Sequence, residues 1–460
     1  MLQPWLGLVR THNVIVVFSF VAGATTAFRL ALHVTERYAG SLIAGFVFGF
    51  SSFHFAHAIG HLNLVSLEWI PLFFLAWLRL FERPSISRGV QAALALFLVL
   101  LCDHYYFFYC VLGGALVLLA QALLRRDLRF WLRPPFVVPL SGFVAVSAFS
   151  SGALVVPLLW LAERDPLSGS HPARYFSLDL LSLWIPGGHW RFPSLTEPFW
   201  SQLAGEPVIE SSVHLGFATT IAVFLAWRQR ASFRTLDLAV WWGMLAFFAV
   251  MSLGPSLQVW GLVYPVVLPY RLLETLVPPL EISGCPVRMV VMVTLAAGIL
   301  AGLGVDELFH RGPRACAGAA LLVLTMAIEL LPGPIPTTPA NPVPGWVLAL
   351  AALPKQYGFM DADGIVVGPP ALYFQTVHEV PMFEGYMARI PASVLQRDAA
   401  LRTLRRRGDF RALCDEHGFA YFLFSRGGAE SMPVAPTWSG EDLELYDVRA
   451  AWGCADTSSR

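Results

Sequence analysis

The chain has 460 residues, and its 31 Lys and Arg balance its 31 Asp and Glu, so it carries no formal net charge. Charged residues make up 13% of the chain, about half their usual share in soluble domains, whereas apolar residues make up 56%. This composition excludes a disordered chain, a basic nucleic-acid-binding protein and an ordinary cytosolic enzyme. It is typical of a polytopic membrane protein.

Apolar segments recur along the first 331 residues, and a run of roughly 18 apolar residues is long enough to cross a bilayer. The sequence predicts about ten transmembrane helices, at residues 13–32, 41–55, 66–80, 90–102, 106–124, 136–161, 213–227, 238–253, 289–305 and 316–331. Several are shorter than the ideal length. Short or broken helices border polar cavities in membrane enzymes and transporters, although an error in the predicted boundary has the same appearance.

A polar run joins the second and third segments and contains His54, His57, His61 and Asn63. On one helix the three histidines, spaced i, i+3 and i+7, would share a face. Ionisable residues at membrane depth are costly and are therefore functional candidates. Three interpretations stay open: a metal site on His57 and His61, a substrate site in which imidazoles and Asn63 bind an anion or a sugar, or structural histidines that bond backbone carbonyls.

A second polar point is the turn Asp103-His104-Tyr105-Tyr106 between the fourth and fifth segments. Asp103 beside this aromatic cluster could act as a base or bind a sugar. The alternative is a helix N-cap at Asp103 with tyrosines at the membrane interface.

Three further charged residues are predicted on the same side of the membrane as the histidine run and the Asp103 turn. They are Glu210, Arg271 and Arg288. Glu210 is expected to open the seventh segment, where it would favour the helix N-terminus or project into an outer cavity. Two arginines at such a cavity suit a lipid-linked phosphate, because guanidinium binds phosphate oxygens in pairs. Anchoring to lipid headgroups is the alternative.

Arginine is concentrated in alternate short connections, around residues 79–88, 125–133, 228–234 and 311–314. The positive-inside rule assigns these connections to the cytoplasm. Both chain ends and the polar run are then extracytoplasmic. Met1 is not followed by a cleavable signal pattern, so we expect a further helix upstream of this sequence.

The sequence predicts three regions: a transmembrane domain over residues 1–331, a proline-rich linker over 332–342 and a small mixed α/β domain over 343–460. In the last region, residues 364–367, 420–424 and 443–448 are predicted strands, and residues 393–404 and 410–417 are predicted helices. Cys414 and Cys454 could pair in an oxidising compartment.

Several motifs resemble those of bacterial multi-pass proteins in the GT-C superfamily, glycosyltransferases that use polyprenyl-phosphate sugars. They are the run Phe50–His57, Gly60-His61-Leu62-Asn63, Trp69-Ile70-Pro71-Leu72, Tyr105-Tyr106, Leu253-Gly254-Pro255, Leu268-Pro269-Tyr270, Pro286-Val287-Arg288, Tyr373–His378 and Gly385-Tyr386. The last two resemble the extracytoplasmic C-terminal domain of these proteins.

The resemblance implies a GT-C-like fold and an inverting transfer of sugar from a polyprenyl-phosphate carrier to a glycan, lipid or protein acceptor. A carboxylate deprotonates the acceptor hydroxyl while cationic groups stabilise the leaving phosphate. Candidate bases are Asp103, Glu68 and Glu210. Candidate substrate contacts are His54, His57, His61, Asn63, His104, Tyr105, Tyr106, Arg271 and Arg288. In the superfamily the key carboxylate lies in an earlier outer loop, so the resemblance implies that this catalytic segment precedes Met1.

Other functions compete with sugar transfer. The broken helices also suit a transporter or flippase for a lipid-linked substrate, and an enzyme-like protein without its base would serve as a membrane scaffold. A divalent metal as cofactor stays open, although the histidines have few further partners for a metalloenzyme.

Overall fold

A computed structural model describes residues 2–125, 133–169, 172–203, 210, 212–229, 235–277, 280, 284–337, 343–366, 368–383, 385, 389–429 and 432–455. Parts of two arginine-rich connections and of the linker, residues 126–132, 230–234 and 338–342, lie outside this set. The chain divides into two compact units. The first comprises Met1–Trp160 and His171–Thr337, and the second comprises Leu161–Ser170 and Thr338–Arg460.

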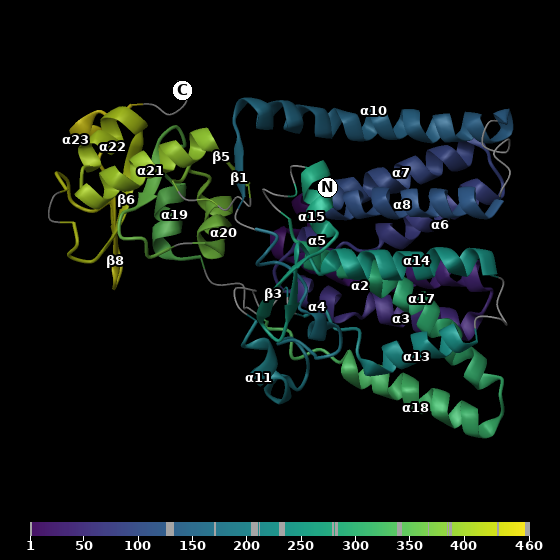
Figure 1. The fold of residues 1–460 in the computed structure, drawn as a ribbon. Helices are drawn as coiled ribbons and strands as arrows, with labels where there is room; N and C mark the ends of the chain where they lie inside the picture. Colours follow the sequence, from purple (N-terminus) through teal and green to yellow (C-terminus); the bar gives the residue numbers. More distant parts are fainter. Residues whose placement is uncertain are drawn as a thin grey trace. The chain divides into compact units, whose positions relative to one another are not determined.

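The first unit is a bundle of helices (Figure 1). Its longer helices are α2 (Leu8–Thr35), α3 (Tyr38–Gly49), α6 (Trp69–Glu82), α7 (Ile86–Cys102), α8 (His104–Arg125), α10 (Pro134–Arg164), α13 (Phe217–Arg228), α14 (Thr235–Ser252), α17 (Val290–Phe309) and α18 (Pro313–Glu329). Short helices α1 (Gln3–Leu6), α4 (Ser52–Ala58), α5 (Leu62–Val65), α11 (Glu197–Trp200) and α15 (Tyr270–Leu276) lie before or between them.

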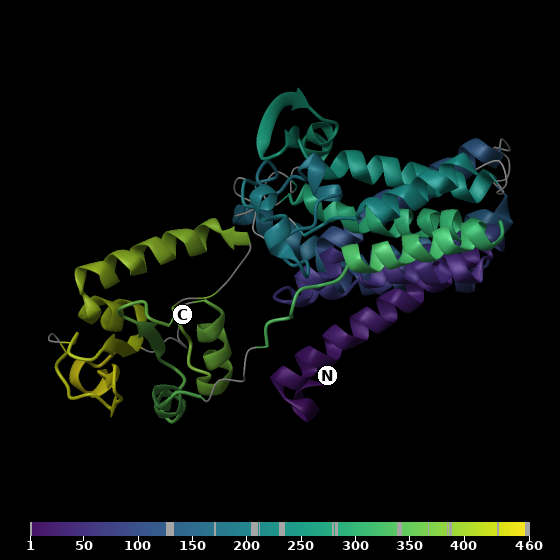
Figure 2. The ribbon, with the colours of Figure 1, turned by 90° about the horizontal axis from the view of Figure 1, so that it is seen from below.

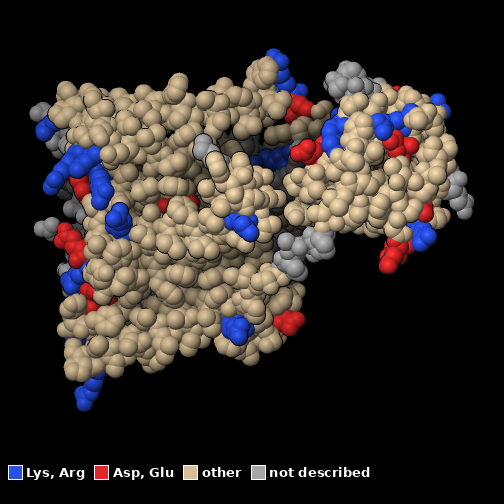
Figure 3. All heavy atoms as spheres, turned by 180° about the vertical axis from the view of Figure 1, so that it is seen from behind, with Lys and Arg blue, Asp and Glu red and all other residues tan. Residues whose placement is uncertain are grey.

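Each of the ten predicted segments falls on a helix, and the second runs from α3 into α4. Within the described residues, five helices are long and apolar enough to cross a membrane, and three shorter apolar helices accompany them. On one face of the bundle, charged side chains gather mainly at one end and leave a broad uncharged surface (Figure 3). The chain is an α-helical polytopic membrane protein, as the composition predicts.

Helix α17 is the centre of the bundle, because its most apolar 18-residue window is completely buried. It packs closely on α3 where two glycines meet: a Cβ on Gly302 would lie 2.1 Å from the carbonyl oxygen of Gly40. Glycines at such contacts let helix backbones approach each other closely. Helix α2, in contrast, leans away from the bundle toward its N-terminus (Figure 2).

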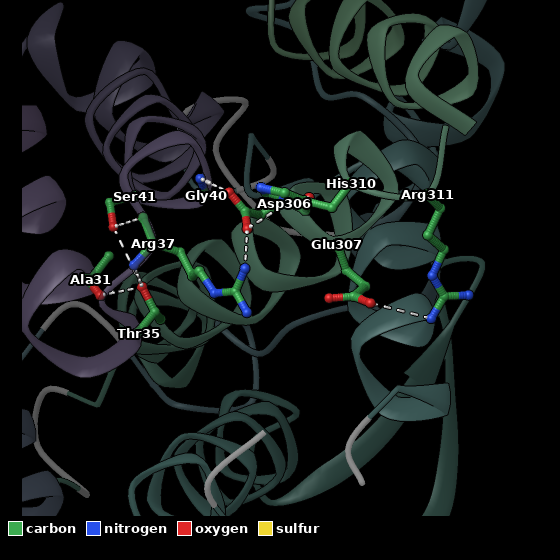
Figure 4. A network of polar contacts seen from close by, with 9 residues as sticks. All are labelled: Ala31, Thr35, Arg37, Gly40, Ser41, Asp306, Glu307, His310 and Arg311. Atoms are coloured by element: carbon green, nitrogen blue, oxygen red, sulfur yellow. Dashed lines mark hydrogen bonds and ion pairs between the residues drawn. The ribbon is translucent and has the colours of Figure 1, made fainter. Parts of the chain in front are cut away.

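A polar network joins α3 and α17 at the end of α17 that is remote from His54 and His57 (Figure 4). The carboxylate of Asp306 accepts a hydrogen bond from the backbone nitrogen of Gly40 at 3.3 Å and pairs with Arg37 at 3.4 Å. Asp306 is buried, so these partners compensate its charge. The network fixes the start of α3 against α17.

Between α10 and α17 the chain forms short elements at the other end of the bundle. They include 3₁₀ turns at Leu180–Leu183, Pro193–Leu195 and Pro286–Met289, and the antiparallel hairpin of β2 (Ser256–Val259) and β3 (Leu262–Val267). The carboxylate of Asp179 accepts a hydrogen bond from Gly261 at the hairpin tip at 2.8 Å.

The second unit is a small α/β domain. Its sheet has the order β4 (Gly358–Asp361), β6 (Phe419–Ser425), β8 (Leu443–Asp447), β7 (Trp438–Ser439), and only β4 and β6 are parallel. A separate pair joins β1 (Leu167–Gly169) to β5 (Arg389–Pro391). The helices are α19 (Gly345–Ala351), α20 (Pro369–His378), α21 (Ala392–Arg407), α22 (Phe410–His417) and α23 (Arg449–Trp452).

Most predicted elements of this unit are confirmed, but the strand predicted at 364–367 is wrong. The strand is β4, which ends at Asp361. The Asp361 carboxylate turns the chain by accepting hydrogen bonds from Gly364 and Val366, and Gly364 has a positive φ of 72°. Residue 367 lies outside the described set. Cys414 and Cys454 form a disulfide.

Candidate functional site

The histidine run forms a bend of two short helices. His54 and His57 lie on α4, whereas His61 is the N-cap residue of α5 with φ −127° and ψ 78°. The prediction that all three share one helix face is therefore wrong, because α4 ends at Ala58 and the chain turns through Gly60. His57 and His61 still lie near each other, with ring centroids 5.6 Å apart.

His54 belongs to a buried cluster with Ser19 and Glu68. The Ser19 hydroxyl lies 3.2 Å from Nε2 of His54 and donates to the Glu68 carboxylate at 2.7 Å. Nδ1 of His54 lies 2.7 Å from the carbonyl oxygen of Gly49, and the ring stacks on Phe20. These contacts tie α2, α4 and the start of α6 together.

His57 belongs to a second buried cluster, which contains an ion pair. Arg288 donates to Oε1 of Glu210 from Nε at 3.1 Å and from Nη2 at 2.5 Å. Nε2 of His57 lies 3.6 Å from the other oxygen, Oε2. Residues from α4, from the segment before α13 and from the start of the central helix therefore meet at one carboxylate.

The charge of this second cluster is compensated inside the protein. Glu210 is 2% exposed and Arg288 is 6% exposed. Burial acts to raise the pKa of the Glu210 carboxyl, but Arg288 and His57 outweigh it and hold this pKa well below its usual range. Glu210 is therefore a carboxylate at neutral pH. The Arg288 guanidinium also lies over the ring of Tyr105, 5.1 Å from its centroid.

Asp103 connects this region to the α7–α8 turn. Its Oδ1 accepts hydrogen bonds from the backbone nitrogens of Tyr105 at 2.8 Å and Tyr106 at 3.2 Å, which is an N-cap arrangement for α8. Its Oδ2 accepts from Nδ2 of Asn63 at 2.8 Å. The Tyr106 hydroxyl donates to the carbonyl of Leu64 at 2.6 Å. Asn63, Asp103 and both tyrosines are thus brought together.

The structure does not bring two predicted residues into these contacts. Arg271 lies on α15 with a side chain that is 67% exposed, and it pairs with Glu274 at 3.3 Å. His104 is exposed at the first position of α8. Glu210 also lies elsewhere than predicted, because α13 begins at Phe217 and residues 212–216 precede it without helical structure.

No group of three or more His, Cys, Asp or Glu side chains that could hold a metal occurs among the described positions. The Nδ1 atoms of His54 and His57 each lie within hydrogen-bond distance of a backbone carbonyl, that of His57 at 2.8 Å from Phe53. These two contacts are those expected of structural histidines that bond backbone carbonyls.

Sequence reasoning missed Ser19, which lies in the first segment without any local motif. Its partners His54 and Glu68 are 35 and 49 residues away. A serine in an apolar helix commonly bonds a carbonyl of its own preceding turn, so nothing in the local sequence separates Ser19 from other helical serines.

Comparison with known proteins gives a family but no activity. No curated protein matches the sequence. The crystal structure of ArnT from Cupriavidus metallidurans bound to undecaprenyl phosphate is similar at a TM-score of 0.45 and 13% sequence identity, over 98% of this chain and 86% of that chain. Residues 1–330 match a family described as a domain of unknown function, DUF6311. Because this match covers well over half of the sequence, the chain belongs to the DUF6311 family.

Proposed function

We propose that the chain is an integral membrane glycosyltransferase that transfers a sugar from a polyprenyl-phosphate donor to an extracytoplasmic acceptor. The observation that carries this proposal is Arg288, a buried guanidinium at one end of an apolar bundle, paired with Glu210 and stacked on Tyr105. The GT-C motifs include Arg288, Tyr105 and the histidine bend, so the resemblance and the geometry support the same residues.

The role of Arg288 follows from electrostatics. A guanidinium binds phosphate oxygens through paired, charge-assisted hydrogen bonds, which strengthen where water is excluded. Glu210 compensates the charge while no ligand is bound, because an isolated buried charge would be very costly. A donor phosphate would share the guanidinium with Glu210, and His57 on the other carboxylate oxygen would hold Glu210 in place.

Among the three candidate bases, we assign proton abstraction to Asp103. Glu210 already neutralises Arg288, and Glu68 is held in the interior by Ser19. Asp103 accepts hydrogen bonds from two backbone N–H groups and from Asn63, which fix the orientation of its carboxylate. A base must be oriented in this way before it can accept a proton from a hydroxyl.

The cellular orientation is part of the same proposal. We assign the arginine-rich connections to the cytoplasm, and the histidine bend and the C-terminal α/β unit to the extracytoplasmic side of the inner membrane. The Cys414–Cys454 disulfide supports this assignment, because disulfides persist in oxidising compartments.

The test is sugar transfer by the protein reconstituted in vesicles with radiolabelled polyprenyl-phosphate sugars and a membrane extract that supplies acceptors. We expect Asp103→Asn to lower the rate by about 10²–10⁴-fold, the usual contribution of a general base. Arg271→Gln, an exposed arginine, is the matched control for Arg288→Gln and should keep the wild-type rate. Unchanged transfer by Asp103→Asn and Arg288→Gln would remove the site assignment.

A non-catalytic role is the second candidate, and one observation favours it. Each nominated carboxylate already has an intramolecular partner: Asn63 for Asp103, Ser19 for Glu68 and Arg288 for Glu210. Binding of undecaprenyl phosphate without turnover of any labelled donor would support a scaffold. Movement of the labelled lipid across the vesicle without a covalent product would support a flippase.

A further inference from the structure

An apolar groove runs along the outside of the bundle between α8 and α10, with a volume of about 660 Å³. Its floor is formed by Phe73 and Trp77 of α6. One wall is the face of α8 that carries Cys110 and Gly114, and the other is the face of α10 that carries Ser147 and Gly152. Small residues on both walls give the groove its width.

The position of α10 explains why the groove exists. Near its start, α10 packs on the bundle, with Phe136 against Phe81 at 5.6 Å and Phe143 against Trp77 at 4.6 Å. Only 6% of its most apolar window is buried, and Pro139 and Pro157 lie inside the helix. Figure 1 shows α10 running beside α7 and α8 along their length.

The groove is separate from the candidate site. Its lining residues on α8 include Phe107, Cys110, Val111 and Gly114, on one face of the helix. Tyr105 and Tyr109 lie on the opposite face, where Arg288 lies over the Tyr105 ring and the Tyr109 hydroxyl donates to the carbonyl of Cys285. A lipid whose phosphate lies at Arg288 would therefore have α8 between its phosphate and the groove.

We propose that this groove binds one acyl chain of a bilayer phospholipid, as a second lipid site distinct from the donor site. Both walls belong to helices long and apolar enough to cross the membrane, so the groove faces hydrocarbon rather than water. Inside a bilayer an apolar chain gains little from leaving water, and association depends on close packing. A chain in the groove contacts walls and floor together, whereas an empty groove loses those contacts.

The test uses vesicles of phosphatidylglycerol and phosphatidylethanolamine that contain a trace of phosphatidylglycerol with a photoreactive acyl chain. After irradiation, the labelled peptides of the full chain are mapped. We expect labelling concentrated on residues 107–118 and 143–156, and resistant to washing with detergent.

Two glycine substitutions make this test specific. A Cβ on Gly152 meets no atom within 4 Å, so the first atom of a larger side chain has room there. We expect the ring of Gly152→Phe to occupy the groove and to lower lipid labelling of the groove by about tenfold, or ~1.4 kcal/mol. Gly243→Phe is the matched control, because Gly243 on α14 has equally open space and does not line the groove.

Two results would overturn the proposal. One is labelling spread evenly over exposed apolar helices such as α18 and unchanged by Gly152→Phe, which would mean that only bulk lipid touches the groove. The other is labelling of the groove by photoreactive undecaprenyl phosphate and not by the phospholipid, which would make it the donor-chain site. Both outcomes are independent of sugar transfer, so the proposed function is tested separately.

Discussion

Arg288 and Glu210 form an ion pair in the candidate site. Both side chains are buried, and each compensates the charge of the other. Breaking such a pair by removing one partner is strongly destabilising, whereas replacing both by apolar residues of similar volume often is not. The stability of a single variant and that of an apolar double variant should therefore differ.

We expect Glu210→Gln to destabilise the protein by about 3–5 kcal/mol, because it leaves Arg288 charged and uncompensated in an apolar surrounding. The double variant Glu210→Gln with Arg288→Met should regain most of this loss. Reversible unfolding in mixed detergent micelles measures both. A single variant as stable as the wild type would mean that water or lipid headgroups reach Arg288.

The C-terminal unit contains a histidine that makes its stability depend on pH. Burial, and to a smaller degree Lys355, lowers the pKa of His378 from 6.5 to about 4. Its Nδ1 accepts a hydrogen bond from the backbone nitrogen of Val380 at 3.1 Å, which requires an unprotonated Nδ1. Between pH 6.5 and 4 the unfolded state binds more protons than the folded state, so acidification favours unfolding.

We therefore expect the free energy of unfolding of residues 343–455 to fall by up to about 3 kcal/mol as the pH drops from 6.5 to 4, and to lose nothing more through this group at lower pH. Hydrogen exchange of β4 and β6 in the full chain measures it. His378→Gln should flatten the profile over this range. An equally steep profile in that variant would assign the effect to another group.

Most residues of the candidate site could be predicted from their residue types. Which of these side chains contact each other could not be predicted. Histidines, carboxylates and arginines in apolar surroundings are conspicuous in a sequence. The pairing of Arg288 with Glu210 joins positions 78 residues apart, and Glu68 with Ser19 joins positions 49 apart. Such pairings depend on how the helices pack, which local spacing does not determine.

At the scale of elements, the contact of α3 with α17 depends on glycine. A Cβ on Gly302 would lie 2.1 Å from the Gly40 carbonyl oxygen, so either helix must move to admit it. Gly45 and Gly49 make comparably close contacts with α2. The packing of the bundle is therefore sensitive to the addition of a single methyl group at these glycines.

We expect Gly302→Ala to destabilise the bundle by about 1–3 kcal/mol, because overpacking outweighs the better helix propensity of alanine. Gly318→Ala on α18 is the matched control, since its Cβ would meet no atom within 4 Å, and it should be neutral or stabilising by up to about 1 kcal/mol. Unfolding in mixed micelles compares them. Equal effects of the two variants would mean that α3 and α17 separate easily.

The length of the apolar runs predicts the membrane helices well but does not predict where they break. Each of the ten predicted segments overlaps a helix, and α22 has the predicted bounds of 410 and 417. The predicted segments leave residues 56–65 as a connection, but they do not predict that short helices α4 and α5 form there with a break between them. Residues 364–366 of the expected strand instead form a turn, since the Asp361 carboxylate accepts hydrogen bonds from Gly364 and Val366. A side chain bonding its own backbone overrides β-propensity there.

At the scale of the whole molecule, the proposed orientation can be tested with the cysteines of the chain. Cys316 is exposed near the start of α18, beside an arginine-rich connection, whereas Cys414 and Cys454 are joined in the C-terminal unit. On spheroplasts, a membrane-impermeant maleimide should not label Cys316. After treatment with an impermeant reductant it should label Cys414 and Cys454.

The variant Cys316→Ser serves as the control that assigns the signal, because its labelling after reduction should be unchanged. Labelling of Cys316 in intact spheroplasts, with protection of the C-terminal cysteines after reduction, would invert the orientation. The positive-inside assignment would then be wrong, and the acceptor would lie in the cytoplasm.

The central claim is that Arg288 receives the phosphate of a polyprenyl lipid, and equilibrium binding of radiolabelled undecaprenyl phosphate to the protein in vesicles tests it most directly. A charge-assisted hydrogen bond contributes about 1.5–3 kcal/mol, so we expect Arg288→Gln to weaken binding by at least about tenfold. Arg271→Gln should bind as the wild type does. Equal binding by wild type and Arg288→Gln, or loss of binding in Arg271→Gln alone, would contradict the claim.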